Sequence, residues 1–261
     1  MPADFNLLRA YIIVLPLIFV AGLVDSVSGG GGLISLPAYW VAGLPPHFAL
    51  GNNKFSSMFG TLFSTGRYFR HKLIDTRIAI LTALCALGGS ALGTRAVLWL
   101  DPHFLNWVLV VVIPIITVFT LLNKRLGHQN DSHLTPVHHR VSISILAGLF
   151  IGFWDGFFGP GTGTFLILIY TAMLKYDYVT ANANTKVVNL ASNIAALTVF
   201  LLHGRVFLPL ALPAMVCGVA GNLVGSSLVL KRGARVIRPL FIGVLALLFA
   251  KILWDLILGQ P

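Results

Sequence analysis

The stretch "VDSVSGGGG" at Val24–Gly32 decides how this chain folds, because it occurs twice in related form. The first copy continues to "GNNKFSS" at Gly51–Ser57, and the second copy reads "WDGFFGPGTG" at Trp154–Gly163 and then "NANTKVVNLASN" at Asn182–Asn193. Each copy has an aspartate before a glycine-rich break and a lysine in the polar stretch that follows. Charges inside apolar sequence are costly in a bilayer and mark ion or substrate pathways, so the doubled pattern is typical of a transporter.

The composition assigns the chain to a class before any motif is considered. Hydrophobic residues make up 57% of the 261 residues and charged residues only 10%, whereas soluble domains carry about 25% charged residues. We therefore expect an all-α membrane protein that crosses the lipid bilayer several times. The net charge of +10 comes from basic residues in short loops between apolar runs. The positive-inside rule explains this pattern without nucleic acid as a partner.

The repeat extends through most of the chain. Asp25 corresponds to Asp155 and, after a short insertion, Lys54 corresponds to Lys186. The polar stretch between the two halves is the natural boundary. We predict a first transmembrane repeat over 1–123, a cytoplasmic linker over 124–140 and a second transmembrane repeat over 141–261.

Each half divides into five apolar segments, of which the second is short. The expected segments are 10–28, 33–43, 49–66, 77–99 and 104–123 in the first half, and 141–158, 164–174, 181–202, 207–230 and 237–258 in the second. A helix of about eleven residues rises about 16 Å, against a hydrocarbon core of about 30 Å, so the short segments are half-helices or parts of broken helices. A break at this depth needs protein or a watery cavity around the freed backbone groups.

The distribution of lysine and arginine favours inverted repeats. If all five segments of each half cross the membrane, most of the 18 basic residues lie on one side, which is then the cytoplasm, and both termini lie outside. The alternative has four crossings per half, eight in all, with broken helices and parallel repeats. That alternative places the basic loop from Lys231 to Arg238 outside, contrary to the charge rule.

The third segment of each half carries the chemistry. Polar side chains recur there at helical spacing and share one face of each helix: Lys54, Ser57 and Thr61 in the first half, and Lys186, Asn189 and Asn193 in the second. Asn52, Asn53, Asn184 and Thr185 are expected at the starts of these helices, where free backbone amides and the helix dipole favour an anion. The two faces together predict a cavity for a small oxyanion such as a sulfonate, sulfite or a carboxylate.

The charged residues of the motifs have two interpretations each. Lys54 and Lys186 either bind substrate or have a structural role, by snorkelling or by pairing with Asp25 and Asp155. The aspartates either cap a broken helix or neutralise a lysine, or they carry a proton through a transport cycle.

At these motifs the chain resembles a known family. "GLVDSVSGGGGLISLPA" with "ALGNNK", and "GFWDGFFGPGTGTF" with "NANTKVVNLASN", are similar to the TauE/SafE family of membrane transporters, the sulfite exporters also called TSUP permeases. The resemblance implies export of sulfite, sulfoacetate or a related sulfonate across a bacterial inner membrane, with proton coupling and alternating access. It also implies that glycines of the breaks belong to the site, namely Gly30, Gly31, Gly161 and Gly163.

Other functions fit the residues less well. An anion channel, or a carrier of small carboxylates, is the alternative to an organosulfur transporter. The polar residues inside the apolar segments include no histidine or metal-type cluster, so we expect no enzyme, cofactor or metal site. Two glycine pairs, Gly89 with Gly93 and Gly221 with Gly225, are interpreted as tight helix packing within the fold, with a homodimer contact as the alternative.

Overall fold

Each half of the chain begins with a long helix that ends at a glycine-rich break. The computed structural model describes residues 5–102, 104–105, 111, 115 and 130–232. In the first half, α1 (Leu7–Ser28) ends where Gly29 adopts a left-handed φ of 70°, a conformation that glycine accepts without strain. It is followed by α2 (Gly32–Val41), α3 (Pro46–Arg70) and α4 (Thr76–Leu98).

The second half follows the same order of long and short helices. A 3-10 turn, η1 (Ser132–Leu134), precedes α6 (Val137–Phe157), which is followed by α7 (Thr162–Ala172), α8 (Tyr178–Leu202) and α9 (Leu208–Arg232). Local sequence sets several of these starts. The Asp177 side chain accepts hydrogen bonds from the first amides of α8, and Pro46 occupies the first turn of α3, where its missing N–H costs nothing.

The all-helical class expected from the sequence is confirmed. The second segment of each half is short, with 10 residues in α2 and 11 in α7. Five of the described helices, α1, α4, α6, α8 and α9, are long and apolar enough to cross a membrane. The expected fifth segments, 104–123 and 237–258, and the first part of the predicted linker lie almost wholly outside the described residues.

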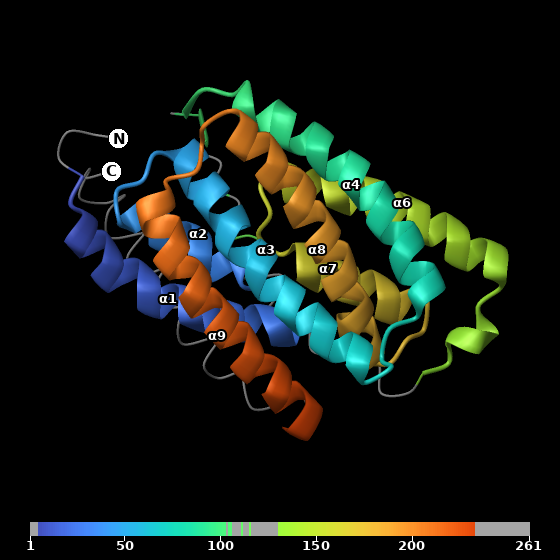
Figure 1. The fold of residues 1–261 in the computed structure, drawn as a ribbon. Helices are drawn as coiled ribbons and strands as arrows, with labels where there is room; N and C mark the ends of the chain where they lie inside the picture. Colours follow the sequence, from blue (N-terminus) through green and yellow to red (C-terminus); the bar gives the residue numbers. More distant parts are fainter. Residues whose placement is uncertain (1–4, 103, 106–110, 112–114, 116–129, 233–261) are drawn as a thin grey trace.

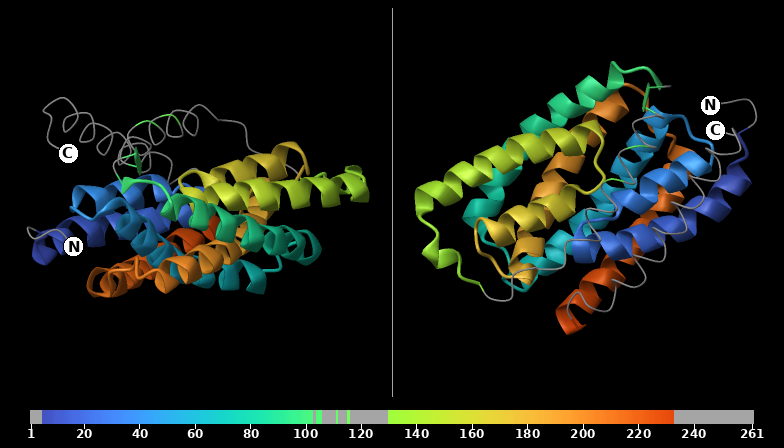
Figure 2. Two further views of the ribbon diagram at one scale, coloured as in Figure 1. Left: turned by 90° about the horizontal axis from the view of Figure 1, so that it is seen from above. Right: turned by 180° about the vertical axis from the view of Figure 1, so that it is seen from behind.

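The helices form two layers (Figures 1 and 2). One layer contains α9, α3, α8 and α4 in this order, with α3 and α8 in contact at its centre. The other layer lies behind it and contains α1, α2, α7 and α6. Across the layers α1 packs on α9 and α6 packs on α4, so helices of one half are covered by helices of the other. The halves are therefore interleaved and share their contacts rather than forming two separate bodies.

Corresponding helices run in opposite directions. In Figure 1, α3 runs from upper left to lower right, whereas α8 runs from lower right to upper left, and α4 and α9 are opposed in the same way. This arrangement is what inverted repeats require. The assignment of either end of the helices to one side of a membrane stays a prediction.

The glycine pairs noted in the sequence lie at the contacts between helices of different halves. A Cβ atom on Gly89 or Gly93 would lie 2.3 Å or 2.1 Å from a backbone oxygen of α6, and one on Gly221 would lie 2.0 Å from the Phe19 oxygen of α1. A Cβ on Gly225 would meet the Ser26 hydroxyl at 2.1 Å. The interpretation as tight packing within the fold is therefore confirmed for both pairs.

We expect Gly89→Ala to destabilise the protein and Gly88→Ala, one residue away, to leave it intact. The Gly89 methyl group would push α4 away from α6, and overpacking of this kind costs about 1–3 kcal/mol. Gly88 has no heavy atom within 4 Å of an added Cβ, and alanine favours the helix by about 1 kcal/mol. Melting temperatures of the two variants in detergent check this, and equal stability of both would contradict the packing described here.

Candidate functional site

The two glycine-rich breaks meet at the centre of the protein. A Cβ on Gly29 would lie 2.4 Å from the Cα of Gly163, and a Cβ on Gly163 would lie equally close to Gly29. Gly161, with φ of 80°, starts α7 in the left-handed conformation. Gly31 folds back on α1, because its Cβ would lie 2.5 Å from the Cβ of Asp25. A larger residue at Gly29 or Gly163 would push the halves apart, and one at Gly31 would collide with α1.

Side chains from other helices satisfy the last carbonyl groups of α1. The Ser26 oxygen accepts hydrogen bonds from Asn182 Nδ2 and from the Tyr68 hydroxyl, each at 2.9 Å. The Val27 oxygen accepts one from the Tyr178 hydroxyl, and the Ser28 oxygen accepts one from Thr164 Oγ1 at 3.1 Å. A helix that ends in an apolar interior needs such donors because no bulk water replaces them.

The lysine of each half forms an ion pair with the aspartate of the other half. Lys54 Nζ lies 2.8 Å from Asp155 Oδ1, and Lys186 Nζ lies 2.9 Å from Asp25 Oδ2. Lys186 also donates to the backbone oxygen of Asp25. The lysine side chains are 1% and 0% exposed, so they do not snorkel to a membrane surface. Of the structural interpretations, pairing with the aspartates is the one observed.

Burying these two crossed ion pairs costs free energy, and removing one partner of a pair costs free energy as well. Removing an ion from water costs several kcal/mol even in a real protein interior, and the attraction of its partner only offsets that cost. Removing one partner leaves the other charge unpaired, at a cost of about 3–5 kcal/mol. Such ion pairs add little net stability, so stability alone does not explain them. An ion pair that one added or removed charge can disrupt is suited to a site that changes conformation.

One expectation about the site is wrong. Asn52, Asn53, Asn184 and Thr185 do not stand at helix starts, because α3 begins at Pro46 and α8 at Tyr178. The four residues lie about two turns inside their helices, where the backbone amides already bond within the helix. An anion bound there would have to use side chains and not free backbone amides.

The polar faces of α3 and α8 are buried and partly unpaired. Asn52 Oδ1 accepts from Phe207 N at 2.9 Å, and Asn53 Oδ1 accepts from Ser35 Oγ at 2.5 Å. Asn193 is buried with 6% of its surface exposed. Several buried side-chain atoms of these faces have no hydrogen-bond partner among the described residues: Asn52 Nδ2, Thr61 Oγ1, Asn184 Oδ1, Thr185 Oγ1 and Asn189 Oδ1. Unpaired buried polar groups are costly and are found where water or a ligand completes them.

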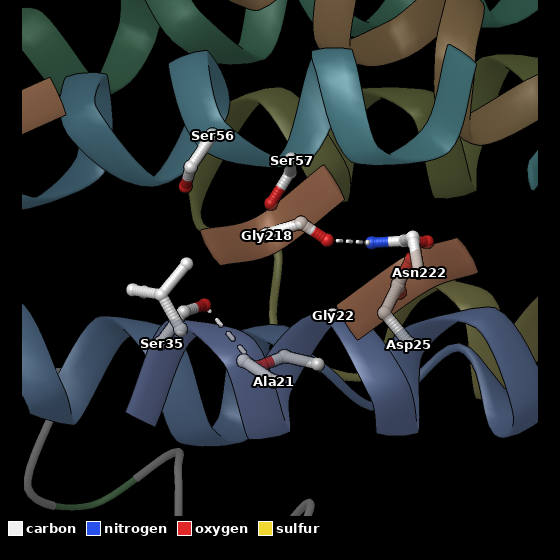
Figure 3. Close-up of a pocket in the computed structure, with 10 residues that line it drawn as sticks. Ala21, Gly22, Asp25, Ser35, Ser56, Ser57, Gly218 and Asn222 are labelled. Atoms are coloured by element: carbon white, nitrogen blue, oxygen red, sulfur yellow. Dashed lines mark hydrogen bonds between the residues drawn. The ribbon is translucent and has the colours of Figure 1, made fainter. Parts of the chain in front are cut away.

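A small pocket of about 20 Å³, with room for about one water molecule, lies beside Asp25 (Figure 3). Its lining comes from α1, the first break, α2, α3 and α9: Ile18, Ala21, Gly22, Asp25, Gly31, Ser35, Ser56, Ser57, Gly218 and Asn222. Of the residues expected in the site, Asp25, Gly31 and Ser57 line this pocket. Gly30 is buried in the break, and neither Lys54 nor Lys186 is among the lining residues.

Several residues of the site were missed by the sequence reasoning. Ser192 donates a hydrogen bond to Asp155 at 2.5 Å, and Asn222 lines the pocket from α9. Tyr68 and Tyr178 complete the end of α1 from remote positions in the chain. A polar residue inside an apolar helix was the available signal for Asn222. No local signal distinguishes a tyrosine that caps a distant helix from one that packs.

Comparison with known proteins finds relatives that are similar along most of the chain. The chain is 32% identical over 237 residues to a probable membrane transporter protein of Haemophilus influenzae, which covers 91% of this chain and 92% of the relative. It is 32% identical over 236 residues to the probable membrane transporter protein YfcA of Escherichia coli K12, covering 90% and 87% of the two chains. A probable membrane transporter protein, ORF9 of a Sinorhizobium species, is 33% identical over 238 residues, covering 91% and 90%.

The family assignment covers nearly the whole chain. No solved structure matches this chain. Residues 14–252 match the family described as sulfite exporter TauE/SafE, and this range includes both glycine-rich breaks and both lysines. Together with the apolar helices and the transporter relatives, this shows that the chain is a multi-pass membrane protein and belongs to the sulfite exporter TauE/SafE family.

Proposed function

We propose that this protein is a secondary transporter that exports a small organosulfur anion, such as sulfite, sulfoacetate or a related sulfonate, across the bacterial inner membrane. The site consists of the polar faces of α3 and α8 with Lys54 and Lys186, and the anion reaches it from one membrane side at a time. The proposed topology has five crossings per half as inverted repeats, with both termini outside and the linker in the cytoplasm.

This proposal rests on the two ion pairs that cross between the halves. Each lysine lies in one half, and the carboxylate that holds it lies at the end of a broken helix in the other half. A substrate anion that replaces a carboxylate as partner of the lysine would loosen the contact between the halves. Binding and rearrangement of the halves would then be one event, as alternating access requires.

Proton coupling follows from the same charges. An anion next to Asp25 or Asp155 would be repelled while the carboxylate is ionised. A proton on the carboxylate removes its charge and leaves the lysine positive, so the lysine can hold the anion instead. Proton and anion would therefore move together. Groups of α3 and α8 that can still donate to the anion oxygens include Asn52 Nδ2 and the hydroxyls of Thr61 and Thr185.

Transport in proteoliposomes tests the function directly. We expect that sulfite or sulfoacetate trapped inside the vesicles drives uptake of the labelled anion from outside, and that the rate saturates with concentration. A carrier must reorient once per substrate, which makes exchange faster than net flux. A current proportional to voltage that does not saturate would identify an anion channel instead, and counterflow with simple carboxylates alone would identify a different substrate class.

Removal of either lysine should weaken anion binding strongly. A hydrogen bond to a charged group contributes about 1.5–3 kcal/mol, so Lys54→Ala or Lys186→Ala should raise the Kd roughly tenfold or more. Each variant should also lose stability, because one buried carboxylate loses its partner. Equilibrium binding of labelled sulfite to purified protein is the measurement.

Two controls separate binding from folding. The double substitution Lys186→Ala with Asp25→Ala removes both charges, and it should recover stability but not affinity. Lys175→Ala removes an exposed lysine outside the site and should change neither. Wild-type affinity in both single lysine variants would exclude the lysines from the site.

The aspartates should determine the response to a pH gradient. In Asp25→Asn and Asp155→Asn the side chain keeps its size but cannot exchange a proton. We expect transport by these variants to become independent of an imposed pH gradient, measured as initial flux with and without the gradient at one internal pH. If the response equals that of the unaltered protein, the aspartates have only a structural role.

A further inference from the structure

The two corresponding aspartates are held in different ways. At Asp155, Oδ1 pairs with Lys54 Nζ at 2.8 Å, and Oδ2 accepts a hydrogen bond from Ser192 Oγ at 2.5 Å. Its side chain is 7% exposed. Both oxygens of this carboxylate therefore have a partner, and little room remains for a further ligand.

At Asp25 one carboxylate oxygen is free. Oδ2 pairs with Lys186, but Oδ1 has no hydrogen-bond partner among the residues that the structure describes, and the side chain is 18% exposed and lines the pocket. The sequence explains the difference. In the register that aligns Lys54 with Lys186, Ser192 aligns with Gly60, which has no hydroxyl group to donate.

The pocket beside Asp25 exists because three other positions also differ between the halves. Ser56 aligns with Val188, which is buried, and Asn222 aligns with Ser90. With α2 and α7 aligned at their first residues, Ser35 aligns with Phe165. Ser56 and Ser35 thus line the pocket beside Asp25 where the corresponding positions beside Asp155 hold the larger apolar residues Val188 and Phe165, whereas Asn222 takes the place of a smaller serine.

The pocket presents oxygen atoms whose hydrogens are already used. Ser35 donates to Asn53 Oδ1 at 2.5 Å, and Ser56 donates to backbone oxygens of α3 at 3.2 Å. Ser57 donates to Asn53 Oδ1 at 3.4 Å. Ser56 Oγ also accepts a hydrogen bond from the Tyr39 hydroxyl at 3.2 Å, so one of its lone pairs is used, whereas the lone pairs of Ser35 and Ser57 have no donor among the described residues. A wall of carboxylate and hydroxyl oxygens without free donors repels an anion and suits a hard cation.

Asn222 adds a side-chain oxygen whose orientation is fixed. Its Nδ2 donates to Gly218 O at 3.1 Å, which fixes which end of the amide is the oxygen (Figure 3). Cβ atoms on Gly22 and Gly60 would lie 2.9 Å and 2.4 Å from this nitrogen, so the amide is clamped between α1 and α3. Asn222 is 2% exposed, and its Oδ1 has no partner among the described residues.

We propose that this pocket is the binding site of the coupling cation, a proton carried by water or a sodium ion, and that Asp25 receives it. Other groups facing Asp25 are Lys186 of α8, with the hydroxyls of Tyr68 and Tyr178 on the neighbouring carbonyls; α2 and α9 present no charged residue to the pocket within the described part of the chain. The proposal rests on the proposed transport function. It assigns the coupling step of this conformation to Asp25 rather than to Asp155, in a pocket that both halves form.

The cation would act by changing the partner of Lys186. Once positive charge neutralises Asp25, the carboxylate holds the ammonium group less tightly, and Lys186 becomes available to the substrate anion. Anion and cation then bind cooperatively, because each makes room for the other. Asp155, with both oxygens bonded, keeps Lys54 in place during this step.

The test transfers the arrangement beside Asp155 to the pocket beside Asp25. The double variant Gly60→Ser with Asn222→Ser places at these positions the residues found at the corresponding positions, Ser192 of the second half and Ser90 of the first half, so it is designed to supply a donor to Asp25 and removes the Asn222 oxygen. The measurements are the melting temperature as sodium chloride replaces choline chloride at constant ionic strength, and the infrared absorption of a protonated carboxylic acid as the pH falls.

In the unaltered protein we expect either a saturable rise in melting temperature with sodium, which identifies sodium, or a carboxylic acid signal that Asp25→Asn removes, which identifies the proton. The double variant should lose this response or need at least tenfold more cation. Asn222→Ser alone, which adds no atom to the helix contact, should weaken it as well. Ser90→Ala, a change at the position that corresponds to Asn222 on α4, should leave it unaltered.

Two results would overturn the cation site: no response of the unaltered protein to either cation, or an undiminished response in the double variant. Sulfite binding to the same preparation is measured separately. If sulfite binds and neither cation does, the transport proposal stands without this site. If a cation binds at Asp25 and no organosulfur anion does, the cation site stands and the proposed substrate is wrong.

Discussion

The arrangement of this protein depends on two lysine–aspartate pairs that cross between the halves. Each pair is buried, so each charge needs its partner, and each partner is supplied by the other half. The lysine helices α3 and α8 must therefore lie next to each other, and the broken ends of α1 and α6 must reach them from opposite halves. The glycines satisfy this requirement, because backbone approaches as close as that of Gly29 and Gly163 leave no space for a side chain.

The same interaction connects structure with transport. A buried ion pair contributes little net stability, since desolvation cancels most of the attraction. In the proposed transport cycle, a proton, a cation or a substrate anion at one pair would alter the contact between the halves.

The halves are similar in backbone and different in side chains, and the differences are concentrated at the ion pairs. Ser192 completes Asp155, while Gly60 leaves Asp25 open. The four-glycine break of the first half corresponds to a break that contains Pro160 and Thr162, whose side chain bonds to Gly159 O at 2.6 Å. In the proposed topology, these unequal copies would give the two membrane sides different chemistry.

Much of the fold could be predicted because membrane helices follow simple rules. Apolar length predicted the helices, the glycines predicted the breaks, and the short second segments appear as α2 and α7. The starts of α3 and α8 were misplaced by about one turn, since Pro46 and the cap at Asp177 begin them before the apolar pattern does. With the helix starts corrected, an anion site made of backbone amides around Asn52 and Asn184 has no basis.

By itself, the sequence determined that this is a helical membrane protein with two related halves, broken helices and charges in the membrane, because composition and spacing along the chain express those properties directly. Only the tertiary structure decided which charge pairs with which. The pairing Lys54–Asp155 and Lys186–Asp25, the closure of Asp155 by Ser192 and the open side of Asp25 beside Asn222 all join residues far apart in the chain. Such contacts depend on how helices cross, and the pattern along one helix carries no information about its neighbour.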